Sequence, residues 1–241
     1  MAIPRFYCPG PWPAHRPVEL PETVARHATS ALRLREGDPL TLFDGQGHEY
    51  PGTLQRDGKR LFAVLGPGTS PLRESPLSMT LVQGISSGDR MDYTLQKAVE
   101  LGINEIIPVF MKRSVVRLSD ERLARRHAHW QAIVVAACEQ CGRNHLPSVA
   151  VPCDFDRWLG TSPGGLLLLL DPEAPDSLRT LPPPTGPVLL LAGPEGGFDP
   201  TERHAAMARG ATGVRLGPRV LRTETAAVAA LAAMQVLWGD F

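Results

Sequence analysis

Leu191-Ala192-Gly193-Pro194-Glu195-Gly196-Gly197-Phe198 decides the fold of this chain, together with Leu216-Gly217-Pro218-Arg219-Val220-Leu221-Arg222-Thr223-Glu224-Thr225 about one helix later. Each stretch follows an apolar run of strand length and precedes a helical pattern. Parallel sheets present backbone groups to bound ligands at such places. We therefore expect both stretches to be ligand loops.

The C-terminal two-thirds of the chain alternates between strand and helix patterns. Its apolar runs are typical of strands in a sheet that is buried on both faces. Asp199-Pro200-Thr201-Glu202 predicts a helix start with an aspartate cap, and this helix should end at Gly210. The alternation predicts an α/β domain with a mainly parallel sheet. The predicted strands are 79–83, 105–110, 149–151, 166–170, 188–192 and 213–216, and the further helices are 91–101, 120–141 (capped by Ser119) and 224–237.

The N-terminal part of the chain predicts a small β-barrel with one helix. Helical spacing runs from Pro21 to Leu34 and stops at Gly37. A linker rich in proline and glycine at 66–76 then separates this part from the α/β domain. The strand patterns flank turns that contain Asp-Gly, and they lie at 40–43, 49–50, 53–55 and 61–65.

Composition limits the class of protein. The chain has 241 residues, of which 43% are hydrophobic, which is enough to bury a core in one large or two modest domains. Its 25 basic and 25 acidic residues give a formal net charge of zero, so any RNA contact must be local. The N-terminus lacks an apolar signal core, and the apolar runs are too short to span a bilayer. We therefore expect a cytoplasmic protein with no membrane partner.

Cys138 and Cys141 have the spacing of a metal or redox pair. They lie inside a helical pattern, however, and no second pair is nearby. His145 could supply a third ligand, but a zinc site needs four. We interpret the pair as chance helical spacing and expect no metal.

The order of five motifs resembles that of the RsmE family of 16S ribosomal RNA uridine-N3 methyltransferases, which belongs to the SPOUT superfamily. Three further motifs resemble the family's N-terminal PUA-like domain, so the resemblance covers nearly the whole chain. The five motifs are the two loops above, Gln96–Gly102, Arg113–Val116 and Glu139–Arg143; the N-terminal motifs are Arg5-Phe6, His27–Arg33 and Glu36–Asp38.

The resemblance implies a PUA-like RNA-binding β-barrel over 1–72 and a SPOUT methyltransferase domain over 73–241. It also implies a deep trefoil knot near the C-terminus, which general fold rules make rare and which the periodicity does not show. The resemblance further implies a homodimer that binds S-adenosylmethionine in its knot loops. The implied cofactor-binding residues are Leu170, Asp171, Leu191, Gly193, Pro194, Glu195, Gly196, Gly197, Leu216, Gly217, Leu221, Glu224 and Thr225.

Methylation of uracil N3 sets its own chemical demands. Methyl transfer is an in-line displacement that needs positioning rather than a covalent nucleophile. The N3 proton must leave, so the site should stabilise negative charge on the base or supply a general base. Arg222 is the first candidate for stabilising the negative charge on the base, and Arg143 is the second. Glu139 is the candidate general base. Alternatively, Glu139 and Arg143 form a structural ion pair at a helix end.

Local basic residues could bind RNA through phosphate contacts that position the substrate. The basic cluster over 112–126 is equally explained as a solvated helix face. Where family members usually carry a lysine ahead of Gly88-Asp89, this chain has Ser86-Ser87, which removes a positive charge, although Arg90 could compensate. The candidate RNA-binding residues are Arg5, Arg33, Arg35, Arg113 and Arg117.

The sequence thus favours an S-adenosylmethionine-dependent methyltransferase that acts on N3 of a specific uridine in 16S ribosomal RNA of the small subunit. One alternative is a non-catalytic RNA-binding or ribosome-assembly factor that uses the knot domain for dimerisation. Such a protein should not bind the methyl donor. A second alternative is a nucleotide-phosphate enzyme that uses the loop at Gly193 as an anion nest, although it lacks the Walker residues.

Overall fold

The computed structural model describes residues 3–10, 12, 16–115, 120–161 and 164–241. The chain divides into two compact units. The N-terminal unit consists of Met1–Glu74 and Cys138–Leu146, and the C-terminal unit consists of Ser75–Ala137 and Pro147–Phe241. The last turn of helix α3 (Asp120–Cys141) therefore belongs to the N-terminal unit.

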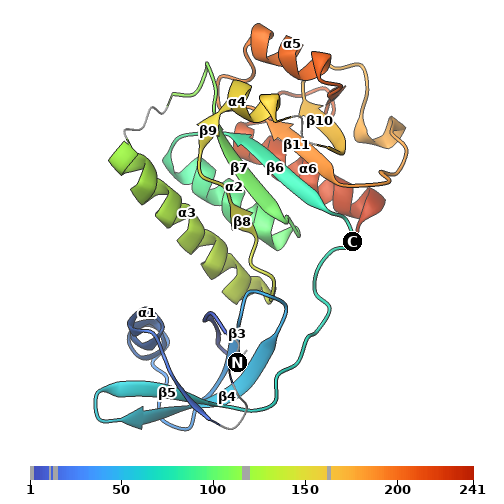
Figure 1. The fold of residues 1–241 in the computed structure, drawn as a ribbon. Coiled ribbons are helices and arrows are strands. Elements are labelled where there is room, and N and C mark those ends of the chain that lie inside the picture. Colours follow the sequence, from blue (N-terminus) through green and yellow to red (C-terminus); the bar gives the residue numbers. More distant parts are fainter. Residues whose placement is uncertain (1–2, 11, 13–15, 116–119, 162–163) are drawn as a thin grey trace. The chain divides into compact units, whose positions relative to one another are not determined.

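The N-terminal unit is built on a five-stranded mixed sheet in the order β1-β3-β4-β5-β2 (Figure 1). β1 runs parallel to β3, and the other pairs are antiparallel. Alternate side chains of the strands, such as Leu40 and Leu42, are buried with Phe6 in one hydrophobic cluster. The strands are β1 Arg5–Tyr7, β2 Pro17–Glu19, β3 Pro39–Phe43, β4 Glu49–Asp57 and β5 Arg60–Leu65.

Two predicted elements of this unit differ from the structure. The strand patterns at 49–50 and 53–55 form one strand, β4, that continues through Pro51 and Gly52. A Cβ on Gly52 would lie 2.7 Å from the carbonyl oxygen of Val64, so glycine here permits close pairing rather than a break. The helix predicted to reach Leu34 is shorter: α1 (Glu22–Arg26) continues as the π-helix η1 (His27–Ala31), and Arg33 at φ 57° lies past its end.

The C-terminal unit contains a seven-stranded parallel sheet in the order β12-β10-β11-β6-β7-β8, with β9 also paired to β7. The strands predicted at 105–110, 166–170 and 188–192 have the same bounds in the structure. The strands are β6 Met79–Gly84, β7 Glu105–Phe110, β8 Ser148–Val149, β9 Cys153–Asp154, β10 Leu166–Leu170, β11 Val188–Ala192 and β12 Thr212–Val214.

Two edge strands are shorter than predicted. The pattern at 149–151 gives only β8, because Pro152 interrupts the pairing with β7 before β9 resumes it. Val151 is accordingly 67% exposed. The strand predicted at 213–216 is β12 (Thr212–Val214), which pairs on one side only, with β10. At the sheet edge, each strand thus ends where its residues no longer pair with a neighbouring strand.

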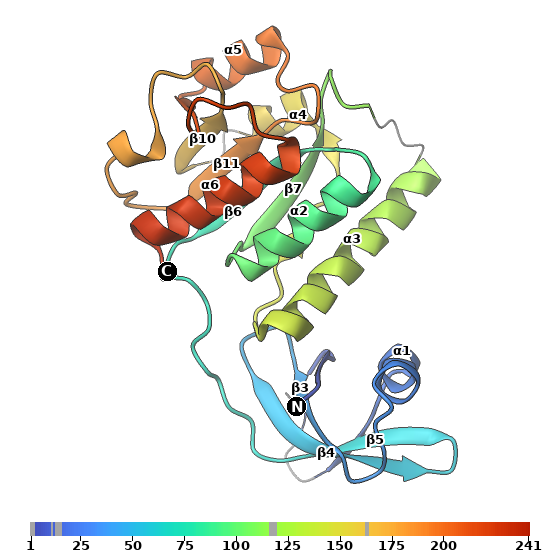
Figure 2. The same cartoon turned by 180° about the vertical axis from the view of Figure 1, so that it is seen from behind.

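Helices cover both faces of the parallel sheet. Figure 2 shows α6, α2 and α3 on one face, and α4 and α5 lie on the opposite face. α2 and α6 pack against each other, and α6 also packs against β11. The helix bounds are α2 Gly88–Glu100, α4 Phe155–Gly160, α5 Pro200–Ala208 and α6 Thr223–Trp238, with a 3-10 turn η2 at Leu178–Thr180.

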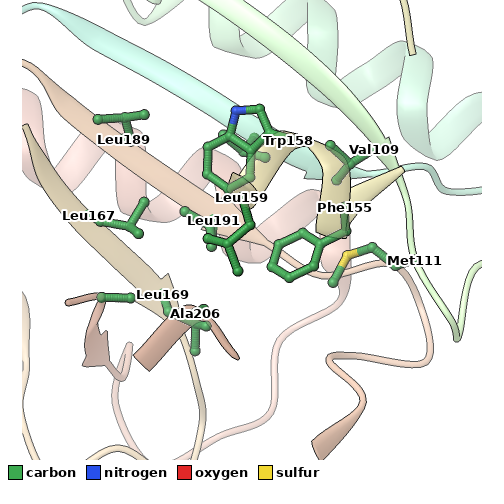
Figure 3. Close-up of a cluster of buried hydrophobic side chains, with 12 residues drawn as sticks. Val109, Met111, Phe155, Trp158, Leu159, Leu167, Leu169, Leu189, Leu191 and Ala206 are labelled. Atoms are coloured by element: carbon green, nitrogen blue, oxygen red, sulfur yellow. The ribbon is translucent and has the colours of Figure 1, made fainter. Parts of the chain in front are cut away.

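A buried hydrophobic cluster fills the space between the sheet and α4 with α5 (Figure 3). Alternate leucines of β10 and β11, among them Leu169 and Leu191, point into it, together with Phe155 and Trp158 of α4 and Ala206 of α5. The intervening leucines of both strands are buried as well. Burial on both faces explains why these strands are continuous leucine runs rather than alternating patterns.

The start of α5 is fixed by the predicted capping box. Asp199 accepts a hydrogen bond from the backbone N–H of Thr201, and the backbone N–H of Asp199 donates one to Oε2 of Glu202 at 3.0 Å. The cap predicted at Ser119 lies outside the described residues. In the part of the chain that is described, no helix has the length and apolar character to cross a membrane.

The C-terminal helix α6 contacts both β11 and η2. η2 belongs to the connection 171–187, whose two ends are anchored in the sheet as β10 and β11. If the C-terminal segment passes through that connection, as a trefoil knot requires, α6 must lie next to η2 and β11. The trefoil knot itself stays a prediction that the resemblance carries.

Candidate functional site

A cavity of about 710 Å³ lies in the C-terminal unit, where β10, β11 and β12 end. Because the strands are parallel, their carboxyl ends meet at one edge of the sheet, and the segments that follow them form the walls. The lining segments are Leu169–Glu173, Ala192–Phe198, and Val214 with Leu216 and Arg219–Glu224, with further contributions from Arg90, Arg113, Pro200, Arg203 and Ala226.

The glycine loop after β11 is closely packed and admits little side-chain volume. A Cβ on Gly196 would lie 2.8 Å from Cβ of Arg113, and one on Gly193 would lie 3.2 Å from Cα of Gly197. Gly197 itself has φ 68°, a conformation that favours glycine. The loop therefore exposes main-chain groups to the cavity, as expected of a ligand loop.

A buried hydrogen-bond network anchors this loop to the sheet and to α6. The side chain of Gln83, at the end of β6, is fully buried, and its Nε2 donates to the carbonyl oxygen of Gly193 at 3.3 Å. The hydroxyl of Thr223 donates to the same carbonyl at 2.6 Å and lies 3.1 Å from Nε2 of Gln83. Three segments far apart in the sequence are thus joined at one carbonyl group.

Asp171 and Arg203 form an ion pair at the end of β10. Nε of Arg203 donates to Oδ2 of Asp171 at 2.6 Å, and the backbone N–H of Glu173 donates to the other oxygen. The Asp171 carboxylate is 7% exposed on its side chain, whereas Arg203 is 45% exposed. The pair fixes the carboxylate at the cavity wall.

Glu195 is the most strongly held side chain of the glycine loop. Its Oε1 accepts hydrogen bonds from the backbone N–H of Ser87 at 2.8 Å and from the Ser87 hydroxyl at 2.6 Å. Arg90 adds an ion pair at 3.1 Å. Burial raises the pKa of Glu195, but these hydrogen bonds outweigh it and bring the pKa below its ordinary value.

The chain matches family models and proteins of known class. A family model described as "RNA methyltransferase domain" matches residues 73–235, and one described as "RNA methyltransferase PUA domain" matches residues 20–65. The ribosomal RNA small subunit methyltransferase E of Buchnera aphidicola subsp. Schizaphis graminum is 31% identical over 99% of this chain and 98% of its own length. The chain belongs to this RNA methyltransferase family.

Two solved structures are similar over their whole length. The methyltransferase E of Neisseria gonorrhoeae, crystallised with S-adenosyl methionine, is 42% identical with a TM-score of 0.92, and the alignment covers 100% of both chains. A Legionella pneumophila protein solved with bound SAM is 36% identical with a TM-score of 0.96, again over 100% of both chains. The family resemblance expected from the motifs is therefore confirmed.

Most residues to which the family resemblance assigns the cofactor line the cavity. Three do not: Leu191 is buried in the sheet, and Gly217 and Thr225 are absent from the lining. Gly217 instead has φ 77° and provides the turn that follows β12. The predicted residues that do line the cavity are Leu170, Asp171, Gly193, Pro194, Glu195, Gly196, Gly197, Leu216, Leu221 and Glu224.

Some residues at the cavity are assigned no cofactor role by the sequence motifs. Arg203 and Arg219 line the cavity, and Ser87 supports it from behind Glu195. No motif carries Arg203, but its position one residue after Glu202 places it on the first turn of α5, beside the cavity. Where family members usually carry a lysine, the segment Ser86-Ser87 provides the Ser87 hydroxyl, which binds Glu195 together with Arg90.

The three predicted catalytic residues lie in different units. Arg222 lines the cavity, is exposed, and occupies the N-cap position of α6 without a side-chain capping bond. Glu139 and Arg143 belong to the N-terminal unit and are not among the lining residues. Of the three, Arg222 is the residue that lines the cavity.

Glu139 and Arg143 each have structural contacts of their own. Oε1 of Glu139 accepts the backbone N–H of Tyr7 at 3.0 Å, and burial raises the pKa of this carboxyl group. Arg143 is 5% exposed, and its Nε donates to Glu74 at 2.9 Å. The structure pairs Arg143 with Glu74, whereas the alternative expected an ion pair between Arg143 and Glu139.

The predicted RNA-binding arginines differ in availability. Arg5 is largely buried, where it pairs with Glu49 and donates to the carbonyl oxygen of Gly142 at 3.2 Å. Arg33 and Arg35 are exposed. Arg113 is exposed at the cavity, where its guanidinium donates to the carbonyl oxygen of Gly196 at 3.2 Å. Arg117 lies outside the described residues.

The cysteines are free thiols. Cys138 is buried, and burial raises its pKa to about 12. Throughout the described ranges, no three or more His, Cys, Asp and Glu side chains are grouped so that they could hold a metal ion.

Proposed function

We propose that this chain transfers a methyl group from S-adenosylmethionine to N3 of a specific uridine in the 16S ribosomal RNA of the small subunit. The observation that carries the proposal is the cavity of about 710 Å³ at the ends of three parallel strands, walled by the backbone of a glycine loop. The structures of two relatives that are more than 35% identical to this chain contain bound S-adenosylmethionine.

The lining residues fit S-adenosylmethionine. Leu170, Leu216 and Leu221 offer apolar walls for the adenine, and the main chain of the glycine loop offers hydrogen-bonding groups. Glu195 and Glu224 supply carboxylates, and each has a buried Oε2 atom with no hydrogen-bond partner. When bound, the cofactor supplies an electrophilic methyl group on a positively charged sulfur, for which unpaired carboxylate oxygens are suitable neighbours.

The chain's own arginines serve the nucleic-acid substrate. Arg222 is exposed and lines the cavity, and its side chain makes no capping hydrogen bond to α6. Its guanidinium can therefore stabilise the negative charge that develops on uracil as N3 loses its proton. Exposed Arg113 can hold a phosphate of the flanking nucleotides. The uridine reaches the cavity by leaving its stack. We assign Glu139 and Arg143 a structural role instead, because Glu139 accepts a hydrogen bond from Tyr7 and Arg143 donates one to Glu74.

The two parts of the chain have separate roles in the proposal. The PUA-like domain over 1–72 binds RNA, with Arg33 and Arg35 as exposed contacts, and the domain over 73–241 carries the chemistry. Arg5 is omitted, because it is engaged with Glu49. The protein acts as a homodimer on ribosomal subunits in the cytoplasm.

The test identifies the methylated product and measures how much Arg222 contributes to the reaction. The protein is incubated with methyl-labelled S-adenosylmethionine and small subunits from cells that lack the modification, and the RNA is digested and analysed by mass spectrometry. We expect 3-methyluridine at one position. Arg222→Ala should lower kcat/KM about a hundredfold with little change in donor affinity. Arg179→Ala, an exposed arginine outside the cavity lining, is the matched control.

Two outcomes would overturn the proposal. Methylation at another atom or on large-subunit RNA would refute the substrate assignment. Binding of RNA without any affinity for S-adenosylmethionine would instead establish the alternative, a non-catalytic ribosome-assembly factor.

A further inference from the structure

Glu195 is held by one oxygen only. Three donors converge on Oε1: the backbone N–H and the hydroxyl of Ser87, and the guanidinium of Arg90. The other oxygen, Oε2, is buried and receives no hydrogen bond in the described structure. The carboxylate is therefore fixed in direction, while half of its hydrogen-bonding capacity is unused.

The Ser87 side chain binds Glu195 instead of capping helix α2. Ser87 occupies the N-cap position of α2, where a serine hydroxyl usually accepts a hydrogen bond from a backbone N–H of the first turn. Here the side chain makes no capping bond and donates to Glu195 instead. The positive end of the α2 dipole also faces this carboxylate, because the Ser87 backbone N–H binds it.

The surroundings keep Glu195 ionised. Burial raises its pKa, and the hydrogen bonds from Ser87 and Arg90 reverse this effect, so that the pKa lies below its ordinary value. A carboxylate with a lowered pKa is a weak general base, but it is a lasting negative charge. Glu224 lines the same cavity and also has a buried Oε2 without a hydrogen bond. Two carboxylate groups thus line one cavity, and their negative charge favours a cationic ligand.

We propose that Ser87 is a positioning residue, which together with Arg90 orients Glu195 as the electrostatic partner of the donor's positively charged sulfur. The inference rests on the proposed function, because it assumes that the cavity takes S-adenosylmethionine. Ser87 lies behind Glu195 and outside the cavity lining, so it acts through the glutamate rather than by touching the donor.

Calorimetry with three ligands tests the assignment. S-adenosylmethionine and sinefungin carry a positive charge at or beside the reacting position, whereas S-adenosylhomocysteine carries a neutral thioether there. Glu195→Gln should weaken both charged ligands about tenfold and the neutral one less than about twofold. Ser87→Ala should shift the same ratio in the same direction by about threefold. Ser148→Ala, at an exposed serine of β8, is the control and should leave the ratio unchanged.

A second measurement needs no ligand. The carboxyl carbon of Glu195 is titrated by NMR in the free protein, and Ser87→Ala should raise its pKa, because two lowering interactions of the carboxylate involve Ser87 and one of them is lost. A general loss of packing would change affinity for all three ligands equally and would not single out this group.

The outcomes separate the inference from the proposed function. If the unaltered protein binds none of the three ligands, the proposed function fails and the inference fails with it. If it binds all three, but the ratio of charged to neutral affinity is the same in Ser87→Ala, Glu195→Gln and the control, only the inference is refuted. A selective loss of charged-ligand affinity with a raised Glu195 pKa supports it.

Discussion

Glu202 is the residue whose removal should most clearly loosen the cavity wall. Its side chain is buried at 3% exposure on the first turn of α5. Oε1 accepts the backbone N–H of Lys112 at 2.8 Å, and Oε2 accepts that of Asp199 at 3.0 Å. Glu202→Ala removes both acceptors at once. It also frees the start of a helix that supplies Pro200 and Arg203 to the cavity.

The magnitude follows from those two bonds. A hydrogen bond to a charged group contributes about 1.5–3 kcal/mol, which sets an upper limit of about 3–6 kcal/mol for the pair. Lys112 is exposed and Asp199 is half-buried, so water can replace part of the loss. We expect Glu202→Ala to lower the free energy of unfolding of the C-terminal unit by about 2–4 kcal/mol. Glu202→Gln keeps one acceptor oxygen and should lose about half as much.

Urea unfolding followed by tryptophan fluorescence measures this loss. Three of the four tryptophans, Trp130, Trp158 and Trp238, lie in the C-terminal unit, so the signal reports mainly on it. His204→Ala, at an exposed position of the same helix, is the control. If Glu202→Ala lost no more stability than this control, water would replace the carboxylate without cost, and the reasoning would be wrong.

Three further predictions concern the loop, the pH response and the thiols. Gly84→Ala should weaken S-adenosylmethionine binding by about tenfold or more in calorimetry, because the new Cβ would lie 2.5 Å from Cδ of Pro194; unchanged affinity would contradict this. Burial raises the pKa of Glu49, but hydrogen bonds from two arginines bring it below its ordinary value. Its stabilisation is therefore present above the unfolded-state pKa and lost as pH falls through the folded-state pKa. Urea titrations at acid and neutral pH should show a smaller pH dependence for Glu49→Gln, and equal dependence would count against the pairing. Burial raises the pKa of Cys8 and Cys138 to about 12, so mass spectrometry after native alkylation near neutral pH should find both unmodified; rapid labelling would show that they are accessible.

Local patterns predicted much of the parallel sheet. The leucine runs gave β10 and β11 with their observed bounds, and the capping box at Asp199 gave the start of α5. These features are local, because strand periodicity and helix caps depend on residues within a few positions of each other. The helix predicted over 21–34 was too long, since helical spacing alone did not reveal that Arg33 would take a positive φ.

The site depended on contacts that no local pattern contains. Ser87 reaches Glu195 across 108 positions, and Gln83 reaches Thr223 across 140. Glu139 and Arg143 stand in one motif, yet the structure assigns them to the N-terminal unit and gives them separate partners.

The sequence by itself determined which segments become strands, helices and glycine loops, because those choices follow from side-chain periodicity and backbone freedom over a few residues. Only the tertiary structure decided which side chains share the cavity at the ends of β10, β11 and β12. Hydrogen bonds and ion pairs act over a few ångströms in space, and the parallel sheet alone brings residues so distant in sequence within that range.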